Sequence, residues 1–313
     1  MKILVFSQYF WPEPFIINDF VRNLEKQGHA VTVATAQPNY PNGKVYSGYK
    51  AFSLKSEAYS SSTRIYRIPI YPRGKAGAKN LILNYISFIL MGLLCFPMIF
   101  FKKKFDVILV FAPSPLLQAI PAIPLKWICR AKLAIWVQDL WPESLSATNF
   151  IKSRFLLSCV GLVVKFIYRT SDLLLVQSRA FVEPVARYAA RSKIVYYPNS
   201  FDSQSMNAEY KNQIPLSLTK ELEKFSFVFA GNLGVAQSLE TVLEAAELVS
   251  DIPEISIVVV GSGSQLQWLE TEIKKRKIMN IHLAGRYPME AMPIIFQKAR
   301  VLMVTLKKDP IFE

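Results

Sequence analysis

Two acidic side chains that follow one apolar segment are the first candidates for acid–base chemistry. Asp139 and Glu143 lie directly after the apolar run 133–137, which is typical of a buried strand. A carboxylate at the end of a strand can act as a general base toward a substrate hydroxyl group. Asp139 comes first out of the strand and is the better placed of the two catalytic candidates. The alternative is that Asp139 is the N-cap of the helix that follows.

Glycine-containing turns after successive strands form the second candidate site, in the last third of the chain. A glycine turn before a helix can present backbone N–H groups and the positive end of the helix dipole to a phosphate. Together the turns predict a nucleotide or nucleotide-sugar site, whereas the alternative is that glycine serves only steric needs. The residues concerned are Gly231, Asn232, Leu233 and Gly234, then Gly261, Ser262 and Gly263, and finally Gly285 with Arg286.

An aromatic and polar segment after the first predicted strand is the third candidate. It holds Gln8, Tyr9, Trp11 and Glu13, and Asn39 follows the second strand at the same edge. Tyr and Trp at such an edge can stack on a sugar or lie against lipid. The alternative is an aromatic loop that packs on its own domain.

A repeating strand–helix pattern must position these candidates. Over residues 1–202 it predicts a complete doubly wound α/β domain, because apolar strand-like runs alternate with segments of helical period. The predicted strands are 2–7, 30–35, 64–70, 107–111, 133–138, 173–177 and 194–197, and the predicted helices are 15–26, 79–101, 115–130, 154–170 and 179–190.

The pattern restarts after a polar, irregular stretch, 203–224, which suits a linker. Residues 225–313 then predict a second, incomplete α/β domain that stops just after a strand. Two doubly wound domains joined by a linker imply a cleft, with ligands at the carboxyl ends of the strands. The predicted strands are 225–230, 255–260, 281–284 and 301–306, and the predicted helices are 238–250, 265–277 and 289–298.

Composition excludes several classes of protein. With 51% hydrophobic residues in 313, the chain is not disordered. Three cysteines without short spacing and two histidines, His29 and His282, predict no metal site and no disulfide framework. Residues 1–200 carry 25 Lys and Arg against 9 Asp and Glu, whereas 201–313 carry 12 against 14. A basic first half indicates an anionic membrane, a diphosphate ligand or nucleic acid as partner.

One uncharged segment, 81–101, is long enough to span a bilayer and is followed by Lys102, Lys103 and Lys104. Asn84, Ser87, Gly92 and Pro97 interrupt it, and a predicted strand follows at once. We therefore expect a helix that belongs partly to the core and partly to the membrane interface, with the lysines on anionic headgroups. A true transmembrane helix is the minority alternative.

The chain resembles the retaining GT-B glycosyltransferases of family 4. The segments that carry the resemblance are the opening strand with 8–13, the turn 27–31, the stretch 136–143, Pro198-Asn199, the turn 231–234 and the turn 261–263. The resemblance covers the whole chain and is closest to the bacterial branch that builds surface polysaccharides, including O-antigen and capsule. L-fucosamine transferases of O-antigen clusters are part of that branch.

The resemblance implies a membrane-facing first domain that binds the acceptor through Gln8, Tyr9, Trp11, Glu13 and Asn39. It implies a second domain that binds a nucleotide-diphosphate sugar, UDP-linked, through the turns at 231–234 and 261–263 and through Arg286. Asp139 and Glu143 are then catalytic, and Asn199 lies at the hinge. The implied enzyme retains the anomeric configuration and needs neither a metal nor another cofactor. Its acceptor is a polyprenyl-diphosphate-linked glycan at the cytoplasmic face of the bacterial inner membrane.

The chain departs from the family in three places. Asn232 and Gln237 stand where family members usually carry Arg and Lys. An acidic region that grips the donor, and a C-terminal helix that returns to the first domain, are expected after residue 313. We therefore expect the sequence to be a truncated product whose own activity is uncertain. The alternatives are an inactive transferase remnant that only docks on membranes and, from charge alone, a nucleic-acid-binding protein. No nucleic-acid-binding motif supports the latter.

Overall fold

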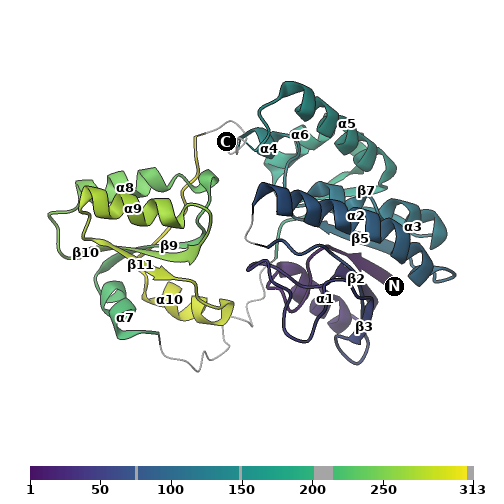
Figure 1. Ribbon diagram of the computed structural model, residues 1–313, viewed down its shortest axis with the longest axis horizontal. Coiled ribbons are helices and arrows are strands. Elements are labelled where there is room, and N and C mark those ends of the chain that lie inside the picture. The colour runs from purple at the N-terminus through teal and green to yellow at the C-terminus, as the bar shows by residue number, and fades with distance from the viewer. Residues whose placement is uncertain (75–76, 148–149, 201–213, 309–313) are drawn as a thin grey trace. The chain divides into compact units, whose positions relative to one another are not determined.

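The computed structural model describes residues 1–74, 77–147, 150–200 and 214–308 (Figure 1). The chain divides into two compact units, Met1–Phe201 and Asp202–Glu313. Each unit is built on its own sheet, and each is described by itself below.

The first unit has an eight-stranded sheet in the order β3-β4-β2-β1-β5-β6-β7-β8. All neighbours are parallel except β3 and β4. The central strands are almost wholly apolar because both of their faces are covered, and this is why their positions could be predicted. The strands are β1 Lys2–Phe6, β2 Ala30–Ala36, β3 Lys55–Ala58, β4 Arg64–Ile68, β5 Val107–Ala112, β6 Lys132–Val137, β7 Leu173–Val176 and β8 Ile194–Tyr196.

Helices cover both faces of this sheet, with α2 and α3 on one side of the strands and α1 on the other (Figure 1). The helix predicted over 115–130 is instead a 3₁₀ turn, Leu116–Ala119, followed by the short helix α3, because Pro121 interrupts the segment just before α3 begins. The helices are α1 Ile16–Lys26, α2 Ala78–Phe100, α3 Ala122–Ile128, α4 Glu143–Ala147, α5 Arg154–Thr170 and α6 Val182–Ala186.

Helix α2 packs on the sheet through one stripe of aromatic side chains. Phe88 and Phe96 lie with their ring centroids 5.8 and 5.1 Å from that of Phe6 on β1. Gly92 lets α2 approach α3, since a Cβ there would lie 2.8 Å from the ring of Pro121. The helix is therefore tied to the sheet along its whole length.

The second unit has a parallel four-stranded sheet in the order β11-β10-β9-β12, with apolar clusters on both faces. Its strands are β9 Phe225–Asn232, β10 Ile255–Ser262, β11 Ile281–Gly285 and β12 Val301–Met303, and its helices are α7 Leu216–Glu223, α8 Leu239–Leu248, α9 Leu266–Arg276 and α10 Met292–Lys298.

The prediction of a linker over 203–224 is wrong for its second half. Residues 216–223 form α7, which buries Leu218 and Leu222 in a cluster with Val228 and Val258. The two leucines are four residues apart and so share one helix face, although the polar residues around them suggest a loop. The first half of the predicted linker lies outside the described residues.

Candidate functional site

An open cavity of about 440 Å³ lies in the first unit, where the parallel strands end. Ligand sites of open α/β sheets form at this edge. The lining comes from the segments after β1, β2, β4, β5, β6 and β7, and from α2. The lining residues are Tyr9, Phe15, Tyr40, Arg73, Tyr85, Pro113, Ser114, Gln138, Asp139 and Gln177.

Asp139 lines this cavity two residues after the end of β6. Its Oδ2 accepts a hydrogen bond from Trp141 Nε1 at 3.2 Å, and Ser144, Ser114 and the backbone of Leu140 also hydrogen-bond to the carboxylate. Burial raises the pKa of Asp139, and these hydrogen bonds offset part of the rise. Because α4 begins only at Glu143, Asp139 is not the N-cap of that helix. A held carboxylate with a raised pKa is suited to accept a hydrogen bond, and then a proton, from a substrate hydroxyl.

Glu143, the second acidic candidate, does not line the cavity. It is the first residue of α4 and accepts a hydrogen bond from the Tyr188 hydroxyl, which raises the pKa of that tyrosine together with burial. The catalytic role of Glu143 stays a prediction, and Asp139 is the one of the two carboxylates that lines this cavity.

An aromatic wall, made of Tyr9, Phe15 and Tyr40, lines the same cavity as Asp139. The Tyr9 and Phe15 rings are stacked with centroids 5.1 Å apart, and Phe15 lies 5.0 Å from Tyr40. Arg73 Nη1 donates to the Tyr9 hydroxyl at 3.2 Å, and its guanidinium carbon lies 5.2 Å from the Tyr40 ring centroid. This wall supplies flat apolar area of the kind that packs on sugar rings or lipid.

Gln8, Glu13 and Asn39 are buried and are not among the lining residues, so their expected contact with an acceptor stays a prediction. Gln8 Nε2 donates to Asn84 Oδ1 on α2 at 2.7 Å. Asn39 Oδ1 accepts from the backbone N–H of Arg73 at 3.1 Å. All three side chains are buried, which was invisible in a segment that reads as a polar loop. Trp11 is 40% exposed but does not line the cavity.

Glu13 joins the two loops that carry the aromatic wall. Its Oε1 accepts from the backbone N–H groups of Asn39 at 2.8 Å and Tyr40 at 2.7 Å, and its Oε2 accepts from Phe10 N–H at 3.1 Å. Burial of this side chain, which is 1% exposed, raises the pKa of Glu13 to about 7 despite these donors.

We expect the stability of the protein to depend on pH through Glu13. Because its folded pKa of about 7 lies above the ordinary 4.5, the folded state holds the extra proton between these values. The free energy of unfolding should therefore fall as pH rises from 4.5 to 7, by about 3 kcal/mol for this group. Denaturant unfolding of the wild type and Glu13→Gln at several pH values measures it. An unchanged difference between the two proteins across that range would contradict the expectation.

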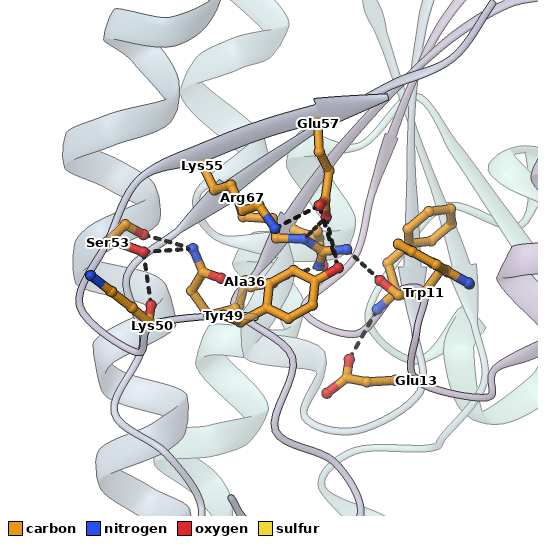
Figure 2. Close-up of polar contacts among 12 residues, drawn as sticks. Trp11, Glu13, Ala36, Tyr49, Lys50, Ser53, Lys55, Glu57 and Arg67 are labelled. Atoms are coloured by element: carbon orange, nitrogen blue, oxygen red, sulfur yellow. Dashed lines mark hydrogen bonds and ion pairs between the residues drawn. The ribbon is translucent and has the colours of Figure 1, made fainter. Parts of the chain in front are cut away.

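Arg67 supports the same loop from the sheet side (Figure 2). Its side chain is fully buried and its Nε lies 2.5 Å from Glu57 Oε1 on β3. Arg67 Nη1 donates to the Ala36 carbonyl at 3.1 Å, and Nη2 donates to the Trp11 carbonyl. One guanidinium thus connects β4 with β3, the end of β2 and the loop after β1.

Three side-chain amides join the ends of neighbouring strands beside Asp139. Asn199 Nδ2 donates to Gln138 Oε1 at 2.9 Å and to Gln177 Oε1 at 2.6 Å, and Gln138 Nε2 returns a bond to Asn199 Oδ1. Asn199, predicted at the hinge, therefore holds two lining residues, two positions before the end of the first unit.

The glycine turns of the second unit lie side by side. Gly231 pairs with Gly261, and a Cβ on Gly261 would lie 1.9 Å from the Gly231 carbonyl oxygen. A Cβ on Gly263 would lie 2.3 Å from the Leu233 carbonyl oxygen. Glycine is therefore required at positions 261 and 263 because the two backbone segments approach closely. This is the steric reason given above as the alternative to phosphate binding. Asn232, Ser262 and Arg286 are exposed at the same strand ends.

Two backbone groups expected to be free for a phosphate are bonded within the unit. Leu233 N–H donates to the Ser262 carbonyl at 3.0 Å, and Gly234 N–H donates to Gln237 Oε1 at 3.1 Å. The Leu233 side chain is part of the apolar core. The residues of these turns are still predicted to bind the donor. The backbone N–H groups of Leu233 and Gly234 are the exception, because both already have an acceptor.

The lysine trio at the end of α2 divides into two kinds. Lys103 Nζ donates to the Tyr66 hydroxyl at 2.8 Å, so Lys103 is held to β4. Lys102 and Lys104 are exposed. Because α2 runs antiparallel to the strands, these lysines lie at the opposite edge of the sheet from the cavity.

Sequence reasoning missed Arg73, Tyr85, Ser114 and Gln177 among the lining residues. Gln177 and Ser114 follow predicted strands, and that position was the available signal. Arg73 and Tyr85 reach the cavity from the segment after β4 and from α2, and only the folded chain reveals this.

Comparison with known proteins agrees with this architecture. Residues 211–311 match the family model described as Glycosyl transferases group 1. The colanic acid biosynthesis glycosyl transferase WcaI of Escherichia coli K12 is 23% identical over 324 residues, covering 98% of this chain and 77% of that protein. The fold and these matches define a glycosyltransferase, and they support transferase activity.

Solved structures show the same fold. Anabaena Alr3699/HepE in complex with UDP and glucose superposes with a TM-score of 0.60 at 13% identity, covering 98% of this chain and 74% of that one. The trehalose-phosphate synthase of Burkholderia vietnamiensis gives 0.67 at 12%, covering 98% and 78%. The predicted GT-B class, with two α/β units built on mainly parallel sheets, is confirmed. A ligand site between the units stays a prediction.

Proposed function

We propose that the protein transfers a sugar from a nucleotide-diphosphate donor to a lipid-linked glycan during bacterial surface polysaccharide biosynthesis. The observation that carries this proposal is the cavity of the first unit, which the Asp139 carboxylate and an aromatic wall line together. The donor is UDP-linked, as in the complex of the Anabaena structure, and N-acetyl-L-fucosamine is the first candidate sugar. The reaction retains the anomeric configuration and needs no metal.

The chain's residues divide the work between the two units. In the first unit, Asp139 accepts a hydrogen bond from the acceptor hydroxyl, and the aromatic wall of Tyr9, Phe15 and Tyr40 holds the acceptor sugar. In the second unit, the turns with Asn232 and Ser262, together with Arg286, bind the nucleotide diphosphate. Negative charge develops on that diphosphate as the sugar leaves, so fixed donors and a cation there favour the transition state.

A transfer assay with the full chain tests the function. The protein is incubated with a polyprenyl-diphosphate-linked N-acetylamino sugar and one of several UDP-sugars, including UDP-N-acetyl-L-fucosamine. Release of UDP together with a product heavier by one sugar is the expected result. Donor binding without product for every sugar would overturn the proposal in favour of an inactive, membrane-docked remnant.

We further propose that the first unit sits peripherally on the cytoplasmic face of the inner membrane. Helix α2 is long and apolar enough to cross a bilayer by length and composition. One of its faces is packed on the sheet, whereas the other exposes Ile82, Ile86, Leu90, Leu94 and Met98. A helix held along its length in this way lies flat in the interface.

Neighbouring helices extend this apolar surface. The connections through α2, α3 and α5 all move the same way along the sheet, so right-handed crossovers place these helices on one face. Trp127 beside the end of α3, and Phe155, Leu162 and Phe166 on α5, are exposed there. An exposed apolar surface next to Lys102 and Lys104 suits an anionic bilayer.

Replacing Lys102 and Lys104 by Gln should lower partitioning onto anionic vesicles by about 10- to 30-fold, since each lysine near the surface contributes about 1 kcal/mol. Lys103 is spared because it is bonded to Tyr66. The matched control removes two exposed lysines of the second unit, Lys220 and Lys274. Equal sedimentation of both variants with vesicles would refute the electrostatic contact.

A further inference from the structure

Among the described residues that line the cavity, Arg73 is the only cationic one, and no described carboxylate forms an ion pair with it. Its Nη1 donates to the Tyr9 hydroxyl, and its guanidinium lies over the rings of Tyr9 and Tyr40, 5.8 and 5.2 Å from their centroids. None of the ion pairs among the described residues includes Arg73. A guanidinium group has five N–H donors, and one donor of Arg73 is used for the Tyr9 hydroxyl. Most of its donors are therefore available to a ligand.

The backbone holds Arg73 in this place. Its N–H donates to Asn39 Oδ1 at 3.1 Å, and the backbone N–H of Asn39 donates to the buried Glu13. Glu13 itself is directed at backbone N–H groups and does not line the cavity. Hydrogen bonds therefore fix the backbone that carries Arg73. The rings of Tyr9 and Tyr40 limit the rotamers that its guanidinium can adopt.

Tyr85 on α2 lines the cavity together with the two charged residues of the lining, Arg73 and Asp139. It hydrogen-bonds with Tyr9, which in turn accepts from Arg73. Burial is the largest cause that raises the pKa of Tyr85, while the charge of Arg73 lowers it and the charge of Asp139 raises it. Both charges therefore act on one hydroxyl, yet they form no ion pair with each other in the described structure. The lining of one cavity therefore carries a cationic and an acidic side chain that are not paired with each other.

We propose that Arg73 binds the phosphate group of a phosphorylated acceptor while Asp139 faces the hydroxyl group that receives the sugar. This inference rests on the proposed transferase function and names the residue that recognises the phosphate of its acceptor. Arg binds phosphate oxygens through two parallel N–H donors, a geometry that a free, planar fork supplies.

Arg73 and Asp139 line one cavity of about 440 Å³, which is the size of a small-molecule site. The phosphate and the reacting hydroxyl therefore belong to the same sugar, so the acceptor is a sugar attached directly to phosphate. Two sources share this chemistry, a free sugar phosphate and a lipid-linked sugar diphosphate, and the test must separate them.

Binding of two probes to the full chain, measured by titration calorimetry with UDP at saturation, tests the inference. UDP occupies the donor site, so the probe reports on the first unit. The probes are N-acetylglucosamine 1-phosphate and geranyl-diphospho-N-acetylglucosamine, with unphosphorylated N-acetylglucosamine as reference. Arg73→Gln should weaken binding of the phosphorylated probe by about 10- to 100-fold and leave the reference unchanged. Arg73→Lys, which keeps the charge but loses the fork, should fall between.

Arg64→Gln is the matched control, because Arg64 is exposed on β4 and has only a 3.4 Å contact with Ser56. Arg73-dependent binding of both probes identifies phosphate as the recognised group, and dependence for the geranyl probe alone identifies a lipid-linked source. Equal affinities of Arg73→Gln and Arg64→Gln for both probes would overturn the inference, even if the wild type transfers sugar. Arg73-dependent binding without any transfer would instead overturn the proposed function.

Discussion

Asp139→Asn is expected to slow sugar transfer by about 100- to 10,000-fold, the range for loss of a positioned acid–base group. Asn preserves the size of the side chain and can still contact Trp141 and the hydroxyls of Ser114 and Ser144. It cannot take a proton from the acceptor hydroxyl. Because Asp139 lies in the first unit and the predicted nucleotide turns lie in the second, the Kd for UDP should stay unchanged.

The measurement is initial-rate product formation with the acceptor and the UDP-sugar that the transfer assay selects. Asp19→Asn is the control, since Asp19 is an exposed carboxylate on α1 that forms a surface pair with Arg22. The melting temperatures of both variants show that the fold survives. A rate for Asp139→Asn within threefold of the control would remove this carboxylate from the reaction.

Much of the fold could be predicted because its signals are local. Apolar runs such as 107–111 and 133–138 are strands buried on both faces, and 15–26 and 154–170 have a clear helical period. Asp139 was found for the same reason, since it is the first acidic residue after such a run. The short edge strand β3, Lys55–Ala58, escaped because its burial alternates and its residues are mostly polar.

The direction of a side chain in a loop is not a local property. Glu13 and Asn39 have the residue types of a binding site, yet they hold backbone N–H groups between loops 26 residues apart. Conversely, Arg73 and Tyr85 meet at the cavity because α2 packs across the sheet. Such contacts depend on tertiary packing, which the spacing of residues along the chain does not encode.

Apolar content also left α2 ambiguous, since a spanning helix and a half-buried helix can have the same composition. What distinguishes them is the partner on one side. Phe88, Gly92, Phe96 and Phe100 are buried along one stripe, and Asn84 in the same stripe hydrogen-bonds to the Tyr71 carbonyl at 2.6 Å. The remaining face has no such partner in the described structure, which is why we propose the membrane for it.

Arg67→Met should destabilise the first unit by about 3–5 kcal/mol, the typical result of removing one partner of a buried ion pair. The loss exceeds that of an exposed pair because Arg67 is fully buried and Glu57 is only 16% exposed (Figure 2). Three acceptors lose the donor that Arg67 supplies: the Glu57 carboxylate, which keeps Lys55 and Tyr49, and the carbonyls of Ala36 and Trp11. The Trp11 carbonyl belongs to the loop that presents Tyr9, so Arg73 and the acceptor cavity should be disturbed as well.

Urea unfolding followed by tryptophan fluorescence measures this effect, since four of the five tryptophans lie in the first unit. Arg64→Met on the same strand is the control and should change stability by less than about 0.5 kcal/mol. The double variant Arg67→Met, Glu57→Gln should recover part of the loss, because the Glu57 carboxylate, which without Arg67 keeps Lys55 as its ion-pair partner, is then absent. If Arg67→Met cost no more than Arg64→Met, Arg67 would not be what holds the loop, and Glu13 alone would have to join the aromatic wall to the sheet.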